Sequence, residues 1–227
     1  GDIIIDVVDV SGDLRGILAR NEGSGEIQVT ATGTVTGINS AGINTQSFAG
    51  SGDVFINTNN TEGVPAGIWA DNDGAGKLQI VSRGTATGTG AGSAGILADN
   101  GNGNGLDIDA VNVAGVDYGL QVVATGAGTV EIDVTGTATA TATGAMGDAV
   151  YVDARTGPAK AMDITVANAT GGRNGIFVNT VWESRGDDDV TITVTGNIQG
   201  GAATDNWRIW ANRHHALTHI NVKNVDR

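Results

Sequence analysis

The sequence predicts an all-β fold, a right-handed parallel β-helix solenoid of about eight coils with about 27 residues per coil. Two short apolar patterns that recur together, and the Gly, Asn and Asp clusters between them, lead to this prediction. Helical repeats are excluded, because no segment shows the helical period of about 3.6 residues over a helix-length stretch. A β-propeller is the competing repeat fold, but its blades need roughly 40 or more residues each, which this period does not supply.

The first pattern is Gly-apolar-x-apolar, and its occurrences lie 24 to 33 residues apart. Because a strand of this length is unstable alone, we expect the occurrences to stack about 4.8 Å apart as parallel strands. Parallel crossover connections are nearly always right-handed, which gives the expected hand. The occurrences are GILA at 16, GINT at 42, GIWA at 67, GILA at 95, GLQV at 119 and GIFV at 175, with AVYV at 149 and RIWA at 208 filling the same slot without Gly.

The second pattern is apolar-x-apolar, and it usually follows the first by 10 to 14 residues. Turn clusters such as DNDGAG (71–76) separate the two patterns. A Thr/Gly tract follows the second pattern, as in TGTVTG (32–37), and we expect it to form a third, weaker strand. The occurrences are III at 3, IQV at 27, VFI at 54, LQI at 78, LDI at 106, VEI at 130, MDI at 162, VTI at 190 and INV at 220.

Composition narrows the classes of function. The formal net charge is −13, which disfavours binding to nucleic acid and to anionic membranes. The absence of Cys excludes disulfides and thiolate zinc sites, and no stretch approaches the roughly 20 apolar residues of a membrane span. The first residues, GDIIIDVVDV, resemble a chain cut in mid-pattern and lack the features of a signal peptide. We therefore interpret residues 1–227 as a single β-helix fragment of a longer protein, without a signal peptide or a translocator barrel.

Three tracts, VTATGTVTGINSAGI (29–43), RGTATGTGAGSAGILADNGNG (83–103) and DVTITVTGNIQGG (189–201), resemble the passenger domain of a bacterial autotransporter of type V secretion. The absence of Cys fits this resemblance, because a disulfide-closed loop would obstruct export. The resemblance implies an outer-membrane-displayed or secreted adhesin or virulence factor that binds host-cell proteins or glycans. It also implies a covalently linked translocator barrel in the full-length protein.

Strand alternation predicts which side chains point outward. In the first pattern the outward row is expected to be Leu18, Asn44, Trp69, Leu97, Gln121, Tyr151, Phe177 and Trp210. Soluble proteins rarely display so long an apolar row, so we interpret its aromatic members, Trp69, Tyr151, Phe177 and Trp210, as partner-binding residues. The alternative is that loops or another domain cover the row.

The outward row of the second pattern is expected to be Ile4, Gln28, Phe55, Gln79, Asp107, Glu131, Asp163, Thr191 and Asn221. Together with Asp109 and Asp133, this row gives an acidic face over three adjacent coils. Clustered carboxylates suit calcium, but the chain lacks the glycine-rich calcium-binding repeat. We therefore predict a solvated acidic face, with no metal and no cofactor.

The segment WESRGDDDV (182–190) contains Arg185, Gly186 and Asp187, the triplet that integrins recognise. The turn between Ile176 and Val190 is about four residues longer than its counterparts, and insertions in solenoids form outward loops. We list the triplet as a candidate contact with a host receptor, and a plain solvated turn as the alternative.

Catalytic motifs are not found. The chain has no GxSxG elbow, its three His are confined to residues 214–219, and no Lys or Arg lies near the carboxylates in the same rows. We therefore expect a protein without enzymatic activity, which inserts in no membrane and whose partner is a host cell-surface receptor or glycan. Two alternatives stay open, a secreted ligand-like effector that activates a host receptor and a polysaccharide-active β-helix enzyme.

Overall fold

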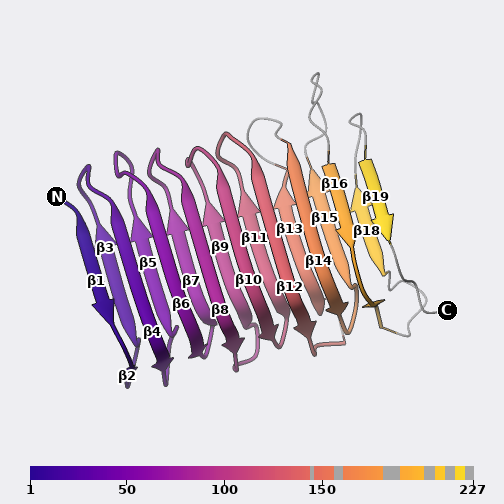
Figure 1. Ribbon diagram of the computed structural model, residues 1–227, viewed down its shortest axis with the longest axis horizontal. Helices are drawn as coiled ribbons and strands as arrows, with labels where there is room; N and C mark the ends of the chain where they lie inside the picture. Colours follow the sequence, from indigo (N-terminus) through magenta and orange to yellow (C-terminus); the bar gives the residue numbers. More distant parts are fainter. Residues whose placement is uncertain (144–145, 156–160, 181–189, 202–207, 213–217, 223–227) are drawn as a thin grey trace.

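The computed structural model describes residues 1–143, 146–155, 161–180, 190–201, 208–212 and 218–222. In this part the chain forms a parallel β-solenoid of about 7 turns, with about 26 residues per turn and no helix (Figure 1). The predicted fold class is therefore confirmed. The eight predicted coils correspond to the eight strands of the smaller sheet. Eight successive strands are separated by seven full turns, which explains the difference between the two numbers. The right-handed sense stays a prediction.

Two sheets run the length of the molecule, and every strand pairs in parallel with its equivalents in the neighbouring coils (Figure 1). The eleven-stranded sheet contains β1 (Ile3–Val7), β2 (Val10–Gly12), β4 (Ile27–Gly37), β6 (Val54–Gly63), β8 (Leu78–Gly88), β10 (Leu106–Gly115), β12 (Val130–Ala140), β14 (Met162–Thr170), β16 (Val190–Val194), β17 (Ile198–Gln199) and β19 (Thr218–Val222). The eight-stranded sheet contains β3 (Ile17–Asn21), β5 (Ile43–Ser47), β7 (Ala66–Asn72), β9 (Ala94–Asn100), β11 (Tyr118–Ala124), β13 (Asp148–Ala154), β15 (Ile176–Thr180) and β18 (Ile209–Asn212).

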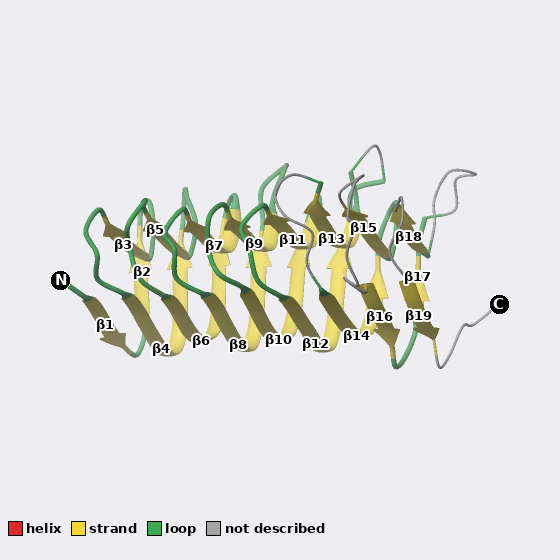
Figure 2. Ribbon diagram, turned by 90° about the horizontal axis from the view of Figure 1, so that it is seen from above, coloured by secondary structure: helices red, strands yellow, loops and turns green. Residues whose placement is uncertain are grey.

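The Thr/Gly tracts were expected to form a third strand in each coil, but in most coils they do not form a separate strand. In β4 the tract continues the strand of the second pattern past a register shift between Ala31 and Thr34. A bulge of this kind bends a strand without ending its hydrogen bonding to the neighbouring strand. The second half of β4 then runs across toward the eight-stranded sheet (Figure 2).

The bulges reveal a repeat of two coils, which the sequence patterns did not. In alternate coils an Asp or Asn side chain accepts a backbone N–H from the bulge of the next coil, at 2.7–3.0 Å. Each donor directly follows a Gly; a Cβ on Gly33 would lie 2.1 Å from Oδ1 of Asp9. The Gly therefore makes room for the acceptor. The donor and acceptor pairs are Thr34 and Asp9, Thr85 and Asn60, Thr137 and Asn112, and Asn197 and Asn168.

The core is a continuous stack of Ile, Val, Leu, Met and Ala side chains between the sheets. Identical positions of successive coils lie one above the other, as Val29, Ile56 and Ile80 do. The Gly of the first pattern is required by close packing at this interface, because a Cβ on Gly67 would lie 2.6 Å from the backbone N of Thr87. None of the described segments is a helix long and apolar enough to cross a membrane.

Buried asparagines close the turns between the eight-stranded sheet and the next strand of the eleven-stranded sheet. Asn72 Nδ2 donates to Asn100 Oδ1 at 3.0 Å, and Asn100 Nδ2 donates to the carbonyl oxygen of Gly105 at 3.2 Å. Both residues are almost fully buried, so these bonds satisfy polar groups that water does not reach. These hydrogen bonds hold the turns after β7 and β9 in place.

Candidate functional site

The outward row of the first pattern has the predicted register along its whole length. Each of its eight residues pairs with the next, from Leu18 to Trp210. The flanking residues Ile68 and Ile176 are completely buried, so the assignment of inward and outward faces is confirmed. The four aromatic members, however, are half-buried rather than fully exposed.

Four aromatic rings gather at the C-terminal end of this sheet. The rings of Tyr151 and Phe177 are stacked with centroids 5.1 Å apart, and those of Phe177 and Trp210 are stacked with centroids 4.2 Å apart. Tyr118, which lies outside the row, contacts Tyr151 at 5.1 Å with its ring tilted by 49°. We call Tyr151, Phe177 and Trp210 the aromatic ladder.

An ion pair supports the ladder from one side. The guanidinium of Arg173 lies 5.3 Å from the centroid of Phe177 and pairs with the carboxylate of Asp148. Asp148 is completely buried, and it also accepts hydrogen bonds from the backbone and side chain of Asn174. The buried carboxylate holds the cation and thereby keeps it close to the ring of Phe177.

Burial and neighbouring charges change the acidity of the two tyrosines here. Burial, followed by the charge of Asp153 and a hydrogen bond to it, raises the pKa of Tyr151 to about 12. Burial is also the main reason why the pKa of Tyr118 is raised. Both hydroxyls are therefore protonated at neutral pH and act as neutral hydrogen-bonding groups.

Between neighbouring rings the ladder presents ring edges to solvent, because the facing ring surfaces are stacked on each other. Consecutive ring planes are within 7° of parallel, so the faces of Phe177 are occupied by Tyr151 and Trp210. A sugar ring stacks on an aromatic face, and such faces are covered inside the ladder. An apolar protein surface needs only contact area, which the half-buried edges supply.

The row is interrupted in its N-terminal half. Trp69 has Asn44 and Leu97 as its register neighbours, so no ring lies directly beside it in the row. Asn44 was expected to point outward, but it is only 1% exposed, and neither Oδ1 nor Nδ2 has a hydrogen-bond partner among the described residues. Large neighbours on either side, Leu18 and Trp69, explain how an outward side chain becomes buried. Trp69 is thus separate from the aromatic ladder.

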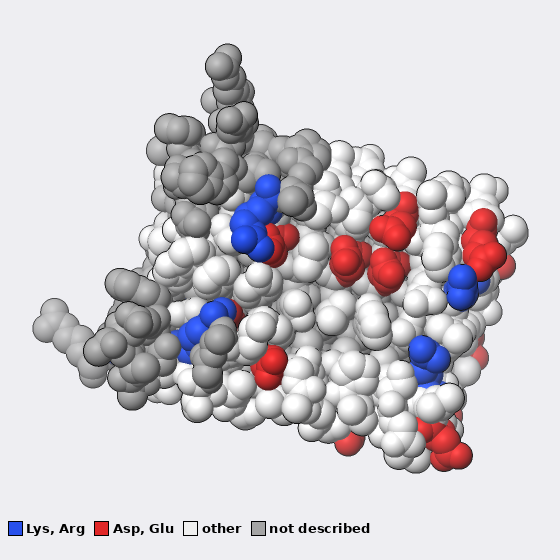
Figure 3. Space-filling view, turned by 180° about the vertical axis from the view of Figure 1, so that it is seen from behind, with Lys and Arg blue, Asp and Glu red and all other residues white. Residues whose placement is uncertain are grey.

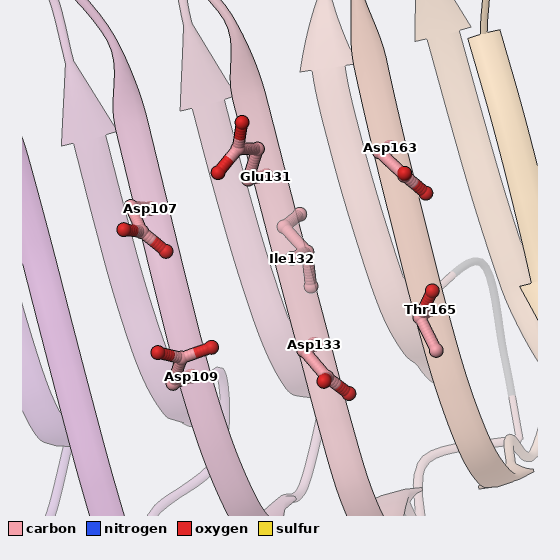
Figure 4. A pocket seen from close by; sticks show the side chains of 7 residues that line it. All are labelled: Asp107, Asp109, Glu131, Ile132, Asp133, Asp163 and Thr165. Atoms are coloured by element: carbon pink, nitrogen blue, oxygen red, sulfur yellow. The ribbon is translucent and has the colours of Figure 1, made fainter.

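The predicted acidic face is present on β10, β12 and β14 (Figure 4). Its carboxylates line a shallow depression of about 210 Å³. Burial and the charges of Asp109 and Asp163 raise the pKa of Asp133. Among the described residues, no group of three or more His, Asp or Glu side chains could hold a metal ion. The acidic residues lining the depression are Asp107, Asp109, Glu131, Asp133 and Asp163.

One cation reaches this face, contrary to the expectation from the rows. Lys77 Nζ lies 3.0 Å from Asp107 Oδ2, which also accepts from Gln79 Nε2 at 3.0 Å. Lys77 precedes β8 and so belongs to neither outward row. Its long side chain crosses to the next coil, a reach that strand alternation alone does not predict.

A second acidic group lies on the eight-stranded sheet, where acidic side chains gather near the middle of the face (Figure 3). Asp71 and Asp99 are register neighbours there, and Asp73 follows in the turn. Burial, then the charges of Asp73 and Asp99, raises the pKa of Asp71 to about 6. Burial and Asp73 also raise the pKa of Asp99. The sequence signal was present as the repeated Ala-Asp-Asn in GIWADN and GILADN, but its significance was missed.

The last coil corrects one predicted register. Thr191 pairs with His219, not with Asn221, which pairs with Thr193. The prediction was two residues too far along the chain. Because side chains alternate with a period of two, a shift of two residues keeps every side chain on the same face, and the apolar pattern cannot detect it.

The triplet Arg185, Gly186 and Asp187 lies outside the described residues, in the gap between β15 and β16. Its role as a receptor contact stays a prediction. The candidate surface that the described residues support is therefore the aromatic ladder, with Trp69 as a separate outward ring.

Fold and surface together define a parallel β-solenoid with an outward aromatic ladder. Comparison of the chain with protein-family models, with curated proteins and with solved structures found no match.

Proposed function

We propose that this chain is a non-enzymatic binding protein that attaches to host cells and contacts a protein receptor through the aromatic ladder. The observation that carries the proposal is the ladder itself, three rings in register on the outer face of the eight-stranded sheet. Aromatic residues are enriched at protein interfaces, where they supply large contact areas at low cost in conformational entropy.

A protein receptor is favoured over a glycan at this surface. The faces of Phe177, which would stack on a sugar, are occupied within the ladder. The guanidinium of Arg173 lies beside the rings and is tied to Asp148. A cation held next to an apolar strip suits a protein interface, where Arg and aromatic residues often form the energetic centre.

The setting of this function follows from the resemblance to autotransporter passengers. A passenger domain is displayed on the bacterial surface or released, so we propose the same location and an adhesin or virulence role for this chain. The parallel β-solenoid is compatible with that class. In the full-length protein we propose a covalently linked translocator barrel.

Attachment of the fluorescently labelled chain to cultured animal cells tests the proposal. Cells are left untreated, treated with a protease that strips surface proteins, or treated with glycosidases. We expect saturable attachment that the protease abolishes and the glycosidases leave unchanged. Loss of attachment after glycosidase treatment alone would reject a protein receptor, and no saturable attachment to any cell line tested would reject the function.

A variant in the same assay tests the predicted integrin contact. Asp187→Ala removes the carboxylate that an integrin-bound cation would ligate. Reduced attachment of the folded variant would add Arg185, Gly186 and Asp187 to the binding surface. Unchanged attachment would reject a role for the triplet and leave the ladder as the contact.

A further inference from the structure

A groove of about 260 Å³ lies on the outer face of the eleven-stranded sheet, away from the aromatic ladder. Sites for drug-sized ligands typically measure roughly 300–1,000 Å³, so this groove suits one small unit of a larger ligand. Its floor and walls come from three adjacent strands, β4, β6 and β8. The side chains that shape it are Glu26, Gln28, Asp53, Phe55, Lys77 and Gln79.

Phe55 occupies the middle of the groove. In register it lies between Gln28 on one side and Gln79 on the other, about 4.8 Å away in each direction. It is the only aromatic residue among those that line the described grooves on this sheet. An aromatic ring between two primary amides offers an apolar contact together with hydrogen-bond donors and acceptors.

One wall of the groove is held in place before any ligand binds. Lys77 Nζ and Gln79 Nε2 both lie 3.0 Å from Asp107 Oδ2. The backbone N–H of Lys77 donates to Asp53 Oδ1 at 2.7 Å. These bonds fix the amide of Gln79 and leave its oxygen as a positioned acceptor, which reduces the entropy lost on binding.

The groove continues along the same strands. A second polar depression of about 210 Å³ begins at Thr30 and Asn57, two residues beyond Gln28 and Phe55. Two residues along a strand span about 6.6 Å, a step similar to the length of one pyranose unit. There Arg83 Nε donates to Asn57 Oδ1 at 3.2 Å, and Asn59 Nδ2 donates to the carbonyl oxygen of Thr32. The two depressions lie end to end along β4 and β6, and we call them together the trough. It is lined by amides, hydroxyls, a single ring and the charged side chains of Glu26, Asp53, Lys77 and Arg83.

The charges of the first groove select among ligands. Glu26 and Asp53 are exposed carboxylates, and the ammonium of Lys77 is paired with Asp107. With Arg83 in the second depression, three carboxylates face two cations along the trough, so an anionic ligand meets net repulsion. A neutral ligand with many hydroxyl groups meets amide and carboxylate partners at no such cost.

We propose that this trough is a binding site for a neutral oligosaccharide, with one sugar ring against Phe55 and the next over Asn57. The site does not depend on the attachment proposed for the aromatic ladder. It lies on the opposite sheet, and its test uses purified sugars and no cells.

Isothermal titration calorimetry on the purified chain tests the site. The probes are cellotetraose, maltotetraose and N-acetylchitotetraose as neutral sugars, tetragalacturonate as an anionic sugar, and tetralysine as a basic peptide. We expect at least one neutral probe to bind with a millimolar or lower Kd, because few contacts are made. Phe55→Ala should weaken that binding by about tenfold or more. Gln28→Ala, at an exposed residue, should also weaken it and leave the fold unchanged.

The matched control is Phe48→Ala, which removes a half-buried phenyl group that lines neither depression and should leave sugar binding unchanged. Three results would overturn the proposal. They are no binding of any neutral probe, equal binding by wild type and both groove variants, or Phe55-dependent binding of tetragalacturonate or tetralysine in place of the neutral sugars. The last result with tetralysine would make the groove a site for basic peptides.

Discussion

The indole of Trp210 stacks on the phenyl ring of Phe177, with ring centroids 4.2 Å apart and ring planes within 7° of parallel. The two residues lie 33 positions apart in the sequence and occupy equivalent places in consecutive coils. The same contact that offers a binding surface therefore also ties β18 to β15. The proposed binding function and the stability of the solenoid therefore share the same residues.

Removing the middle ring tests the stabilising part of this coupling. Phe177→Ala breaks two stacked ring pairs, which contribute about 1–3 kcal/mol together, in addition to the lost burial. Phe55→Ala is the matched control, because Phe55 is also half-buried but makes no ring contact among the described residues. Urea denaturation should give a larger loss of unfolding free energy for Phe177→Ala. Equal losses would show that stacking adds nothing to burial.

The buried pair of Asp148 and Arg173 gives a second prediction. Arg173→Met removes the cation and leaves a completely buried carboxylate with only its remaining donors, including Asn174. Breaking one side of a buried pair typically costs about 3–5 kcal/mol, and we expect the lower end of this range because of those donors. The double variant Asp148→Asn/Arg173→Met should recover part of the loss. A double variant less stable than Arg173→Met would contradict this account.

Two asparagines with opposite surroundings give a third prediction. Asn44 is buried without hydrogen-bond partners, whereas both polar atoms of Asn100 are bonded. Asn44→Leu should raise the unfolding free energy by about 1 kcal/mol, because it removes an unsatisfied amide and places Leu beside Leu18. Asn100→Leu should lower it, because it removes two buried hydrogen bonds, one with Asn72 and one with the carbonyl oxygen of Gly105. Thermal unfolding of both variants checks the opposite signs, and destabilisation by both would refute the argument.

The acidic group on the eight-stranded sheet predicts a pH dependence. The pKa of Asp71 is raised from 3.8 to about 6, chiefly by burial and then by Asp73 and Asp99. Between these values the unfolded chain ionises before the folded one, so stability falls as pH rises from about 4 to above 6. After allowance for solvent screening of a carboxyl that is only partly buried, we expect a contribution of about 1 kcal/mol.

Asp71→Asn should remove this contribution, so the variant gains stability relative to wild type between about pH 4.5 and about pH 7.5. Denaturation curves at both pH values provide the measurement. High salt should reduce the stability difference between wild type and Asp71→Asn only in part. Salt screens the charges of Asp73 and Asp99 but does not change the desolvation of Asp71. The same difference between wild type and variant at both pH values would exclude the raised pKa.

Much of the fold could be predicted because one period governs it. Alternation alone separated Ile68 from Trp69, and the recurrence of the first pattern put Phe177 beside Trp210 although 33 residues separate them. The features that the sequence patterns missed depend on the length of a side chain and on the size of its neighbours. The contact of Lys77 with the acidic face depends on a long side chain that leaves its own coil, and the burial of Asn44 depends on the size of its neighbours.

The two-coil repeat was missed for a different reason. Its signal is a single Asp or Asn in one coil and a single Gly in the next, among many residues of the same types. Only the hydrogen bond between them makes these residues a pair. Likewise, the slip between Asn221 and His219 leaves every face unchanged, so no apolar pattern could have exposed it.

The most direct test of the central claim, that the aromatic ladder is a binding surface, is attachment of ladder variants to host cells. Tyr151→Ser/Trp210→Ser removes the outer rings of the ladder, and Gln121→Ser changes the neighbouring non-aromatic position of the same row. Attachment is measured at a temperature at which circular dichroism shows all three chains folded. The account predicts a loss of about tenfold or more in apparent affinity for the double variant and no change for Gln121→Ser. Equal attachment by wild type and the folded double variant would contradict it.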